Sequence, residues 1–208
     1  MTVIVKRFQD SGVSYSELVE LLHDSFKERL EQGLAFTCSS MTVEDYIEKT
    51  DGKQVFVALD CENQNLVGTV TLQFCKDPNG IIYGYHEYLA VSPKAKNNGV
   101  GSAMLNSIEE LVKAVRGEYI LSDTAVGATS SVKWHLKNGF RIVRLKSYES
   151  TDYYSYGFRK QIVPSIFWDN ALFCKIVFIK SSIATKMKLK KNGESTFVGK
   201  MLKFRNAL

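Results

Sequence analysis

The spacing of apolar residues along this chain switches between a period of two and a period of about 3.6. Segments rich in β-branched and aromatic residues, bounded by turn-forming residues, predict β-strands. Residues 60–65 and 76–80 are polar and turn-like, which favours hairpins between neighbouring strands. The predicted strands are residues 3–8, 54–59, 66–74, 81–91, 119–122, 140–145 and 153–158.

Four segments between these strands repeat apolar residues at intervals of three and four, which predicts amphipathic helices. Each begins near a Ser or Thr that can cap a helix or after a glycine-bearing loop, and three of them end at a glycine. The predicted limits are Ser14 or Ser16 to Gly33, a short helix from Thr42, Val100 to Gly117, and Ser130 or Ser131 to Asn138-Gly139.

The order of these elements predicts the fold class. It reads β-α-α-β-β-β-α-β-α-β-β, without an internal repeat or a low-complexity segment. Helices that connect successive strands in the second half imply some parallel pairing, because parallel neighbours need a long crossover. The sequence therefore predicts an α/β protein of the α+β type with a mixed sheet.

Charge divides the chain near its C-terminus. The whole sequence has 27 Lys and Arg against 22 Asp and Glu, a net charge of +5. Residues 164–208 hold nine basic and two acidic residues, a balance of +7, which leaves −2 for the rest. We therefore predict a main domain at residues 1–163 and a basic extension at 164–208. Residues 165–183 of the extension are predicted to be helical, with a small hairpin that turns at Asn192-Gly193 and returns through Phe197 and Val198.

Composition argues against several classes of protein. No segment approaches the roughly 20 apolar residues of a transmembrane helix. The N-terminus lacks the basic segment and apolar run of a signal peptide. The four cysteines lie far apart and form no Cys/His cluster, which disfavours a zinc site or a disulfide framework. We therefore expect reduced thiols, no metal, no stable membrane insertion and a cytoplasmic location.

The most informative stretch is a strand that runs through a loop containing Gly99 and Gly101 into a helix. The first-turn amides of a helix lack partners in the helix, and its dipole favours anions there, so this loop predicts a phosphate site. Lys94 and Lys96 add positive charge. A dinucleotide fingerprint is disfavoured because Met104 occupies its third glycine position, and a P-loop because Ser102 follows Gly101.

Residues 96–101, Lys-Asn-Asn-Gly-Val-Gly, resemble the Arg/Gln-x-x-Gly-x-Gly/Ala motif of the GNAT superfamily of N-acetyltransferases. The preceding Leu-Ala-Val-x-Pro and the later Asn138-Gly139-Phe140 are also typical of that family, and the resemblance covers roughly residues 2–161. It implies the GNAT fold and transfer of the acetyl group of acetyl-CoA to a primary amine by direct attack in a ternary complex. It also implies cofactor contacts from Leu89, Ala90, Val91, Lys96, Asn97, Asn98, Gly99, Val100, Gly101 and Ser102.

The chain departs from the family pattern at three places. Lys96 keeps the positive charge of the leading Arg but loses its planar fork. Ala128 stands near the place where many members carry an asparagine, and His135 stands where they often carry a tyrosine. These two departures motivate an alternative, a catalytically impaired acyl-CoA-binding or scaffold protein.

Candidate catalytic residues follow from what the reaction requires. An amine is mostly protonated at neutral pH and must lose a proton before it attacks. Glu87 is the first candidate base, because simple alternation puts it on the face of Leu89, and several members of the resembled family carry a Glu or His there. His86 alternates to the opposite face, although a bulge would exchange the two. His135 is a candidate proton donor to the departing sulfur. Two further residues are candidates for contact with the substrate: Tyr85 would orient it, and Asp123 would bind a cationic acceptor.

The expected partners are a small-molecule or peptide amine acceptor and, because dimers are common in the resembled family, a second copy of the chain. No nucleic-acid partner is expected, since the chain has no helix-turn-helix or stacking-aromatic pattern. The basic extension is interpreted first as a helix that packs on the main domain or on a second subunit. Contact with anionic lipid or with an anionic acceptor stays open.

Overall fold

The computed structural model describes residues 1–148, 151 and 153–191. The chain divides into two compact units, residues 1–120 and 121–208. The predicted mixed α/β class is confirmed, and each predicted strand is present. The predicted boundary between residues 163 and 164 stays a prediction. Among the described residues, each helix is too short or too polar to span a bilayer.

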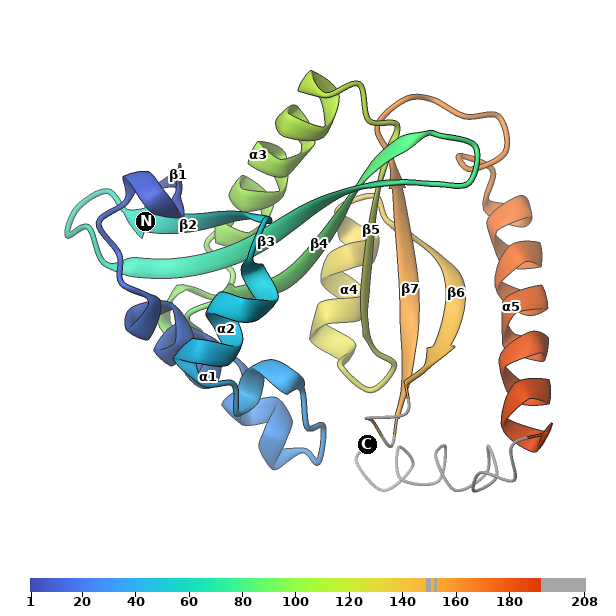
Figure 1. Ribbon diagram of the computed structural model, residues 1–208, viewed down its shortest axis with the longest axis horizontal. Coiled ribbons are helices and arrows are strands. Elements are labelled where there is room, and N and C mark those ends of the chain that lie inside the picture. The colour runs from blue at the N-terminus through green and yellow to red at the C-terminus, as the bar shows by residue number, and fades with distance from the viewer. Residues whose placement is uncertain (149–150, 152, 192–208) are drawn as a thin grey trace. The chain divides into compact units, whose positions relative to one another are not determined.

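The first unit is built on an antiparallel meander of four strands in the order β1-β2-β3-β4 (Figure 1). Alternation along these strands sends one set of side chains to each face of the sheet. The register pairs Val57 with Thr69 and Leu72 with His86. The strands are β1 (Val3–Arg7), β2 (Gln54–Asp60), β3 (Leu66–Lys76) and β4 (Ile82–Val91).

Two helices, α1 (Tyr15–Glu31) and α2 (Val43–Thr50), cover one face of this meander (Figure 1). Each begins with a capping box, in which the first-turn backbone and the cap residue exchange hydrogen bonds, from Ser14 and from Thr42. Of the two serines expected to cap α1, Ser14 is therefore the one used. The apolar faces of both helices bury a core with β2 that includes Leu18, Leu22, Phe26, Tyr46, Val55, Val57 and Leu59.

The opposite face of the meander carries α3 (Val100–Ala114), whose N-terminal turn lies directly against β3. The close approach depends on Gly68. A Cβ atom built there would lie 2.8 Å from Met104 Cε and 2.9 Å from Val100 Cγ1. Any side chain on Gly68 would therefore push the start of α3 away from the sheet.

We expect Gly68→Ala to lower the free energy of unfolding by about 1–3 kcal/mol, the usual cost of overpacking a filled core. The end of Met104 can swing aside, but the branched Val100 cannot, so Val100 decides the cost. Denaturant unfolding of Gly68→Ala, Val100→Ala and the double variant measures the coupling between them. The double variant should lose less stability than the two single losses combined; strictly additive losses would contradict this contact.

Among its described residues, the second unit contains three strands in the order β5-β7-β6, with β6 and β7 antiparallel. The strands are β5 (Tyr119–Ala125), β6 (Arg141–Ser147) and β7 (Tyr154–Gln161), and the helices are α4 (Thr129–Lys137) and α5 (Ala171–Lys191). α5 packs along β6, where the hydroxyls of Ser181 and Thr185 donate hydrogen bonds to the carbonyl of Leu145.

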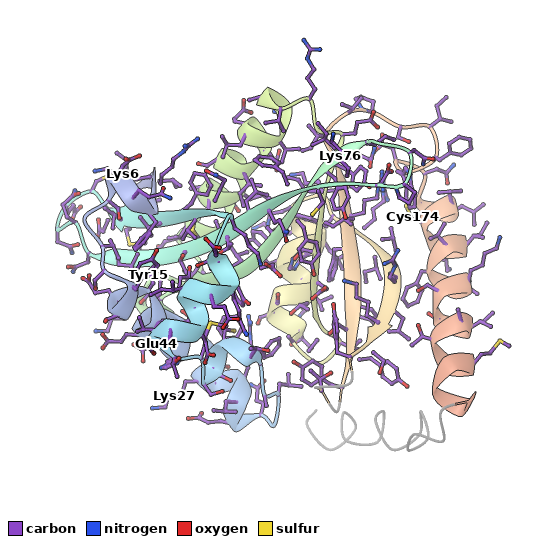
Figure 2. The ribbon with its side chains drawn as sticks, viewed as in Figure 1. Lys6, Tyr15, Lys27, Glu44, Lys76 and Cys174 are labelled. Carbon is purple, nitrogen blue, oxygen red and sulfur yellow. The ribbon has the colours of Figure 1, made fainter. Side chains whose placement is uncertain are left out.

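The limits of α5 differ from the predicted helix at residues 165–183. Residues 165–169 form a turn, and the Asn170 side chain then caps the helix by accepting from the amides of Leu172 and Phe173. Cys174, in the first turn of α5 (Figure 2), donates through Sγ to the carbonyl of Trp168. The helix continues through the basic run at residues 186–191, which was predicted to follow it. The predicted hairpin after residue 191 lies outside the described residues.

Candidate functional site

Strand β4 contains a bulge just before its end. Thr69 pairs with Ala90 and Thr71 pairs with Glu87, so one residue of β3 faces two residues of β4, Tyr88 and Leu89. Tyr88 adopts a φ of 50°, which costs a non-glycine residue about 1–2 kcal/mol. Strain of this kind collects at functional sites, because the surrounding structure must hold it in place.

Because of the bulge, the side chains of β4 occupy other faces of the sheet than simple alternation predicts. Simple alternation would place Glu87 on the face of Leu89, but the register places it with Ala90, on the side of Thr69 and Thr71. This is the face that α1 and α2 cover. Tyr85, two residues before Glu87, lies half-buried on the same face.

Glu87 is held by an ion pair that the sequence analysis missed. The Nζ atom of Lys53 lies 2.5 Å from Glu87 Oε2, and their side chains are 17% and 28% exposed. Lys53 lies in the turn between α2 and β2, 34 residues earlier in the chain. The pair fixes the orientation of a carboxylate that keeps further acceptor sites for other donors.

Two tyrosines lie on this side of the sheet: Tyr88, which follows Glu87 in β4, and Tyr46, which belongs to α2. The ring of Tyr46 is fully buried, and its centroid lies 6.1 Å from that of Tyr88. Burial and then the charge of Glu87 raise the pKa of Tyr88, and burial raises the pKa of Tyr46. Both phenols therefore stay protonated at neutral pH, and their hydroxyls are neutral donors. Neither tyrosine was singled out from the sequence.

His86 lies on the opposite face of β4, paired with Leu72. Its side chain is 3% exposed, and the neighbouring Gly84 on the same face packs against Val112 of α3. The bulge follows His86 rather than preceding it, so it does not turn this ring toward the face of Glu87. The geometry favours a packing role for His86 over the predicted catalytic one.

The loop between β4 and α3 presents its backbone to solvent. Asn97 and Gly99 have φ angles of 66° and 80°, and Gly99 caps α3. The first intrahelical bond runs from the amide of Ala103 to the carbonyl of Gly99. The amides of residues 100–102 therefore precede the helical ladder and point toward the end of the helix, where the dipole is positive. This arrangement suits the phosphate oxygens of a diphosphate.

Side chains around this loop are held by α1. Lys96 Nζ lies 3.0 Å from Glu28 Oε2 in an exposed ion pair, and this contact lowers the pKa of Glu28. Exposed pairs are weak, so Lys96 can exchange Glu28 for a phosphate. The hydroxyl of Ser25 donates to the carbonyl of Val91 at 3.0 Å and ties the end of β4 to α1.

His135 is enclosed within the second unit. Its Nδ1 lies 2.8 Å from the carbonyl of Ser131, and its Nε2 lies 3.1 Å from Ser122 Oγ. The ring stacks on Phe158 with centroids 4.3 Å apart and is 3% exposed. Because protein atoms engage both ring nitrogens, the geometry favours a structural role over the predicted transfer of a proton to sulfur.

The carboxylate of Asp123 already forms an ion pair within the protein. Its Oδ2 accepts from Lys146 Nζ at 2.6 Å and from the hydroxyl of Tyr148 at 2.7 Å. Burial lowers the pKa of Lys146, but the charge of Asp123 and the hydrogen bonds to Asp123 and Tyr148 together outweigh it, so the net shift is upward. Burial and the same charge raise the pKa of Tyr148. The geometry therefore does not favour Asp123 as the binding group for a cationic acceptor.

Comparison with known families and structures identifies the fold. The model of the acetyltransferase (GNAT) family matches residues 15–140. No curated protein sequence matches significantly. A GNAT-family acetyltransferase from Staphylococcus aureus Mu50 is 19% identical, with a TM-score of 0.59 over 77% of this chain and 99% of that one.

Two further solved structures are also similar in fold. The NatC complex bound to Gag peptide and CoA matches at 13% identity and a TM-score of 0.61, over 77% of this chain and 99% of that one. Chaetomium thermophilum Naa20 in complex with a bisubstrate analogue matches at 15% identity and a TM-score of 0.59, over 76% and 86%. At these identities the likeness concerns the fold.

Proposed function

Because the chain belongs to the GNAT acetyltransferase family, we propose that this enzyme transfers the acetyl group of acetyl-CoA to a primary amine by direct attack in a ternary complex. The observation that carries the proposal is the β4–α3 connection. A strand with a bulge at Tyr88 runs into an exposed loop whose glycine cap opens a helix. The N-terminus of α3 suits the diphosphate of acetyl-CoA, because helix N-termini bind anions. The strained end of β4 beside it suits the thioester that is attached to the same molecule.

We assign the diphosphate of acetyl-CoA to the backbone amides of residues 99–102. Lys96 and Lys94, both exposed beside the loop, supply positive charge. Gly68 supports this arrangement by letting the start of α3 pack closely on β3. When bound, acetyl-CoA supplies an activated acetyl group as a thioester. We assign contact with its carbonyl oxygen to the backbone at the end of β4, residues 89–91.

We assign the first proton transfer to Glu87, which accepts a proton from the ammonium form of the acceptor directly or through one water. The nitrogen–carbon bond then forms as the carbon–sulfur bond breaks. The ammonium loses two protons in total, of which one returns to the thiolate and one goes to solvent. No proton step is assigned to His86 or His135, because each is 3% exposed and packed in its own unit.

The experiment that tests this function measures release of the CoA thiol with a panel of amines. The panel contains small amines, amino sugars, amino acids and peptides with a free N-terminus, and their N-acetylated forms are the matched controls. We expect acetyl-CoA-dependent thiol release with at least one free amine and no release with its blocked form, with mass spectrometry showing one added acetyl group. Acetyl-CoA that raises the melting temperature without any turnover would instead identify a binding protein.

A further inference from the structure

Helix α5 exposes a continuous apolar stripe. Ile176, Ile179 and Ile183 are 45%, 49% and 54% exposed, and Leu172 and Met187 extend the stripe at both ends. Their spacing of three and four residues places them on one side of the helix. The side chains that contact β6, among them Ser181 and Thr185, lie on the opposite side. The stripe therefore lies on the side of α5 away from Ser181 and Thr185, with Ile179 and Ile183 at its edge toward the sheet.

Lysines border the stripe on both sides. At about 100° per residue, Lys175 and Lys186 lie along one border and Lys180 along the other. All three are exposed. Residues 171–191 contain six lysines and no Asp or Glu. The helix therefore presents an apolar centre between two rows of positive charge, and none of its own residues is acidic.

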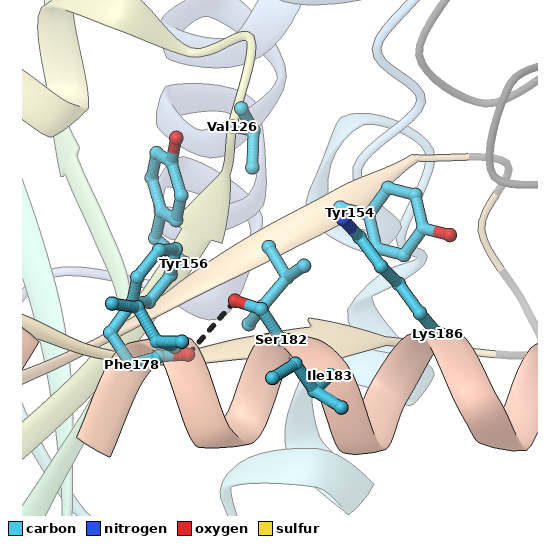
Figure 3. Close-up of a pocket in the computed structure, with 9 residues that line it drawn as sticks. Val126, Tyr154, Tyr156, Phe178, Ser182, Ile183 and Lys186 are labelled. Carbon is cyan, nitrogen blue, oxygen red and sulfur yellow. Dashed lines mark hydrogen bonds between the residues drawn. The ribbon is translucent and has the colours of Figure 1, made fainter. Parts of the chain in front are cut away.

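The apolar surface continues beyond the stripe. Ile179 and Ile183 also line a pocket of about 360 Å³ between α5 and the sheet, with Leu145 and Tyr156 on its other wall (Figure 3). At the start of α5, the 64% exposed Phe167 contacts Phe173 with ring centroids 5.4 Å apart. Contiguous apolar surface of this kind marks an interaction site.

We propose that this face of α5 docks on the surface of an anionic lipid bilayer. The helix lies in the interface, with the stripe toward the acyl chains and Lys175, Lys180 and Lys186 on the lipid phosphates. A second copy of the chain is disfavoured, because pairing α5 with itself would bring like-charged lysine rows together. Nucleic acid is disfavoured because the centre of the face is apolar and offers phosphates no contact.

The first test uses the full chain in flotation assays with vesicles of phosphatidylcholine alone and of phosphatidylcholine with 30% phosphatidylserine. We expect binding to the anionic vesicles that weakens as salt rises. The triple variant Lys175→Gln/Lys180→Gln/Lys186→Gln should lose about 100-fold in partition coefficient, at roughly fivefold per lysine.

The matched control removes the same charge elsewhere. Lys27→Gln/Lys49→Gln/Lys137→Gln changes three exposed lysines outside α5, of which Lys27 lies on α1 (Figure 2). This variant should bind like the parent protein. Equal losses in the two triple variants, or no binding of the parent to anionic vesicles, would overturn the proposal.

The second test addresses the stripe. Ile176→Ser/Met187→Ser should weaken anionic-vesicle binding about tenfold or more, since burying an apolar side chain stabilises by about 1.5–3 kcal/mol. Ile4→Ser/Leu30→Ser, which alters two exposed apolar residues outside α5, is the control. All variants change exposed positions, so melting curves should match the parent. Unchanged binding of the stripe variant would overturn the proposal. So would a parent dimer, seen by sedimentation, that the stripe variant abolishes while vesicles do not bind.

Discussion

Gly101→Glu is expected to weaken acetyl-CoA binding by about 100-fold or more, because a carboxylate placed beside the diphosphate costs several kcal/mol of like-charge repulsion. Gly101 is buried in the first turn of α3, where the amides precede the helical ladder. Isothermal titration calorimetry with acetyl-CoA measures the loss. Turnover should fall with it at any cofactor concentration below the new dissociation constant.

Two further variants separate this effect from general damage to α3. Asn106→Glu adds the same charge at an exposed position of the same helix and should keep the parent affinity. A Cβ atom at Gly99 would meet no atom within 4 Å, although the φ of 80° makes Gly99→Glu cost about 1–2 kcal/mol of stability. Both Gly99→Glu and Gly101→Glu should fail to bind acetyl-CoA. Normal affinity in the folded variants would contradict the assignment of the diphosphate to this loop.

Glu87→Gln is expected to lower turnover at neutral pH by about 10²- to 10⁴-fold, the usual contribution of a positioned general base. The amide has the same shape as the carboxylate but does not accept the proton of the acceptor amine. Acetyl-CoA affinity should change by less than about twofold, because Glu87 is not assigned to the diphosphate loop. Steady-state kinetics with the acceptor found by the amine panel, together with calorimetry, measures the two effects.

The ion pair with Lys53 supplies the control for this prediction. Lys53→Met removes the partner but leaves the carboxylate in place, so it should reduce turnover far less than Glu87→Gln. The pH–rate profile is the decisive readout, since only loss of the base removes its acidic limb. Equal losses of turnover in the two variants, with an unchanged pH–rate profile, would show that Glu87 is a structural partner of Lys53 and not the base.

Most elements of the fold could be predicted from the sequence because their signals are local. The hydrophobic period, the capping residues and the glycines lie within a few positions of the structures they specify. Thr42 predicted the start of α2, and the loop with Gly99 and Gly101 predicted the start of α3, whose phosphate site stays a prediction. The end of α5 was missed, because the predicted helix stopped at residue 183, although the lysines at residues 186–191 are good helix formers.

The candidate site could be predicted only in part, since its details depend on pairing between distant strands. The alternation of β4 placed Glu87 with Leu89, and one extra residue at Tyr88 reversed that result. The ion pairs were harder still to predict, because their partners are far apart in sequence. Lys53 and Glu87 are separated by 34 residues, and Asp123 and Lys146 by 23. A charged residue carries no local signal of the partner that it will meet.

By itself, then, the order of residues specified which segments become strands and helices and where α3 begins after its glycine cap, since both depend on neighbours in the chain. The tertiary structure decided which face each side chain of β4 occupies, which cation neutralises each carboxylate and that both candidate histidines are enclosed. The physical reason is that register, ion pairs and burial arise from contacts between segments far apart in sequence. Their geometry exists only once the strands have paired and the helices have packed.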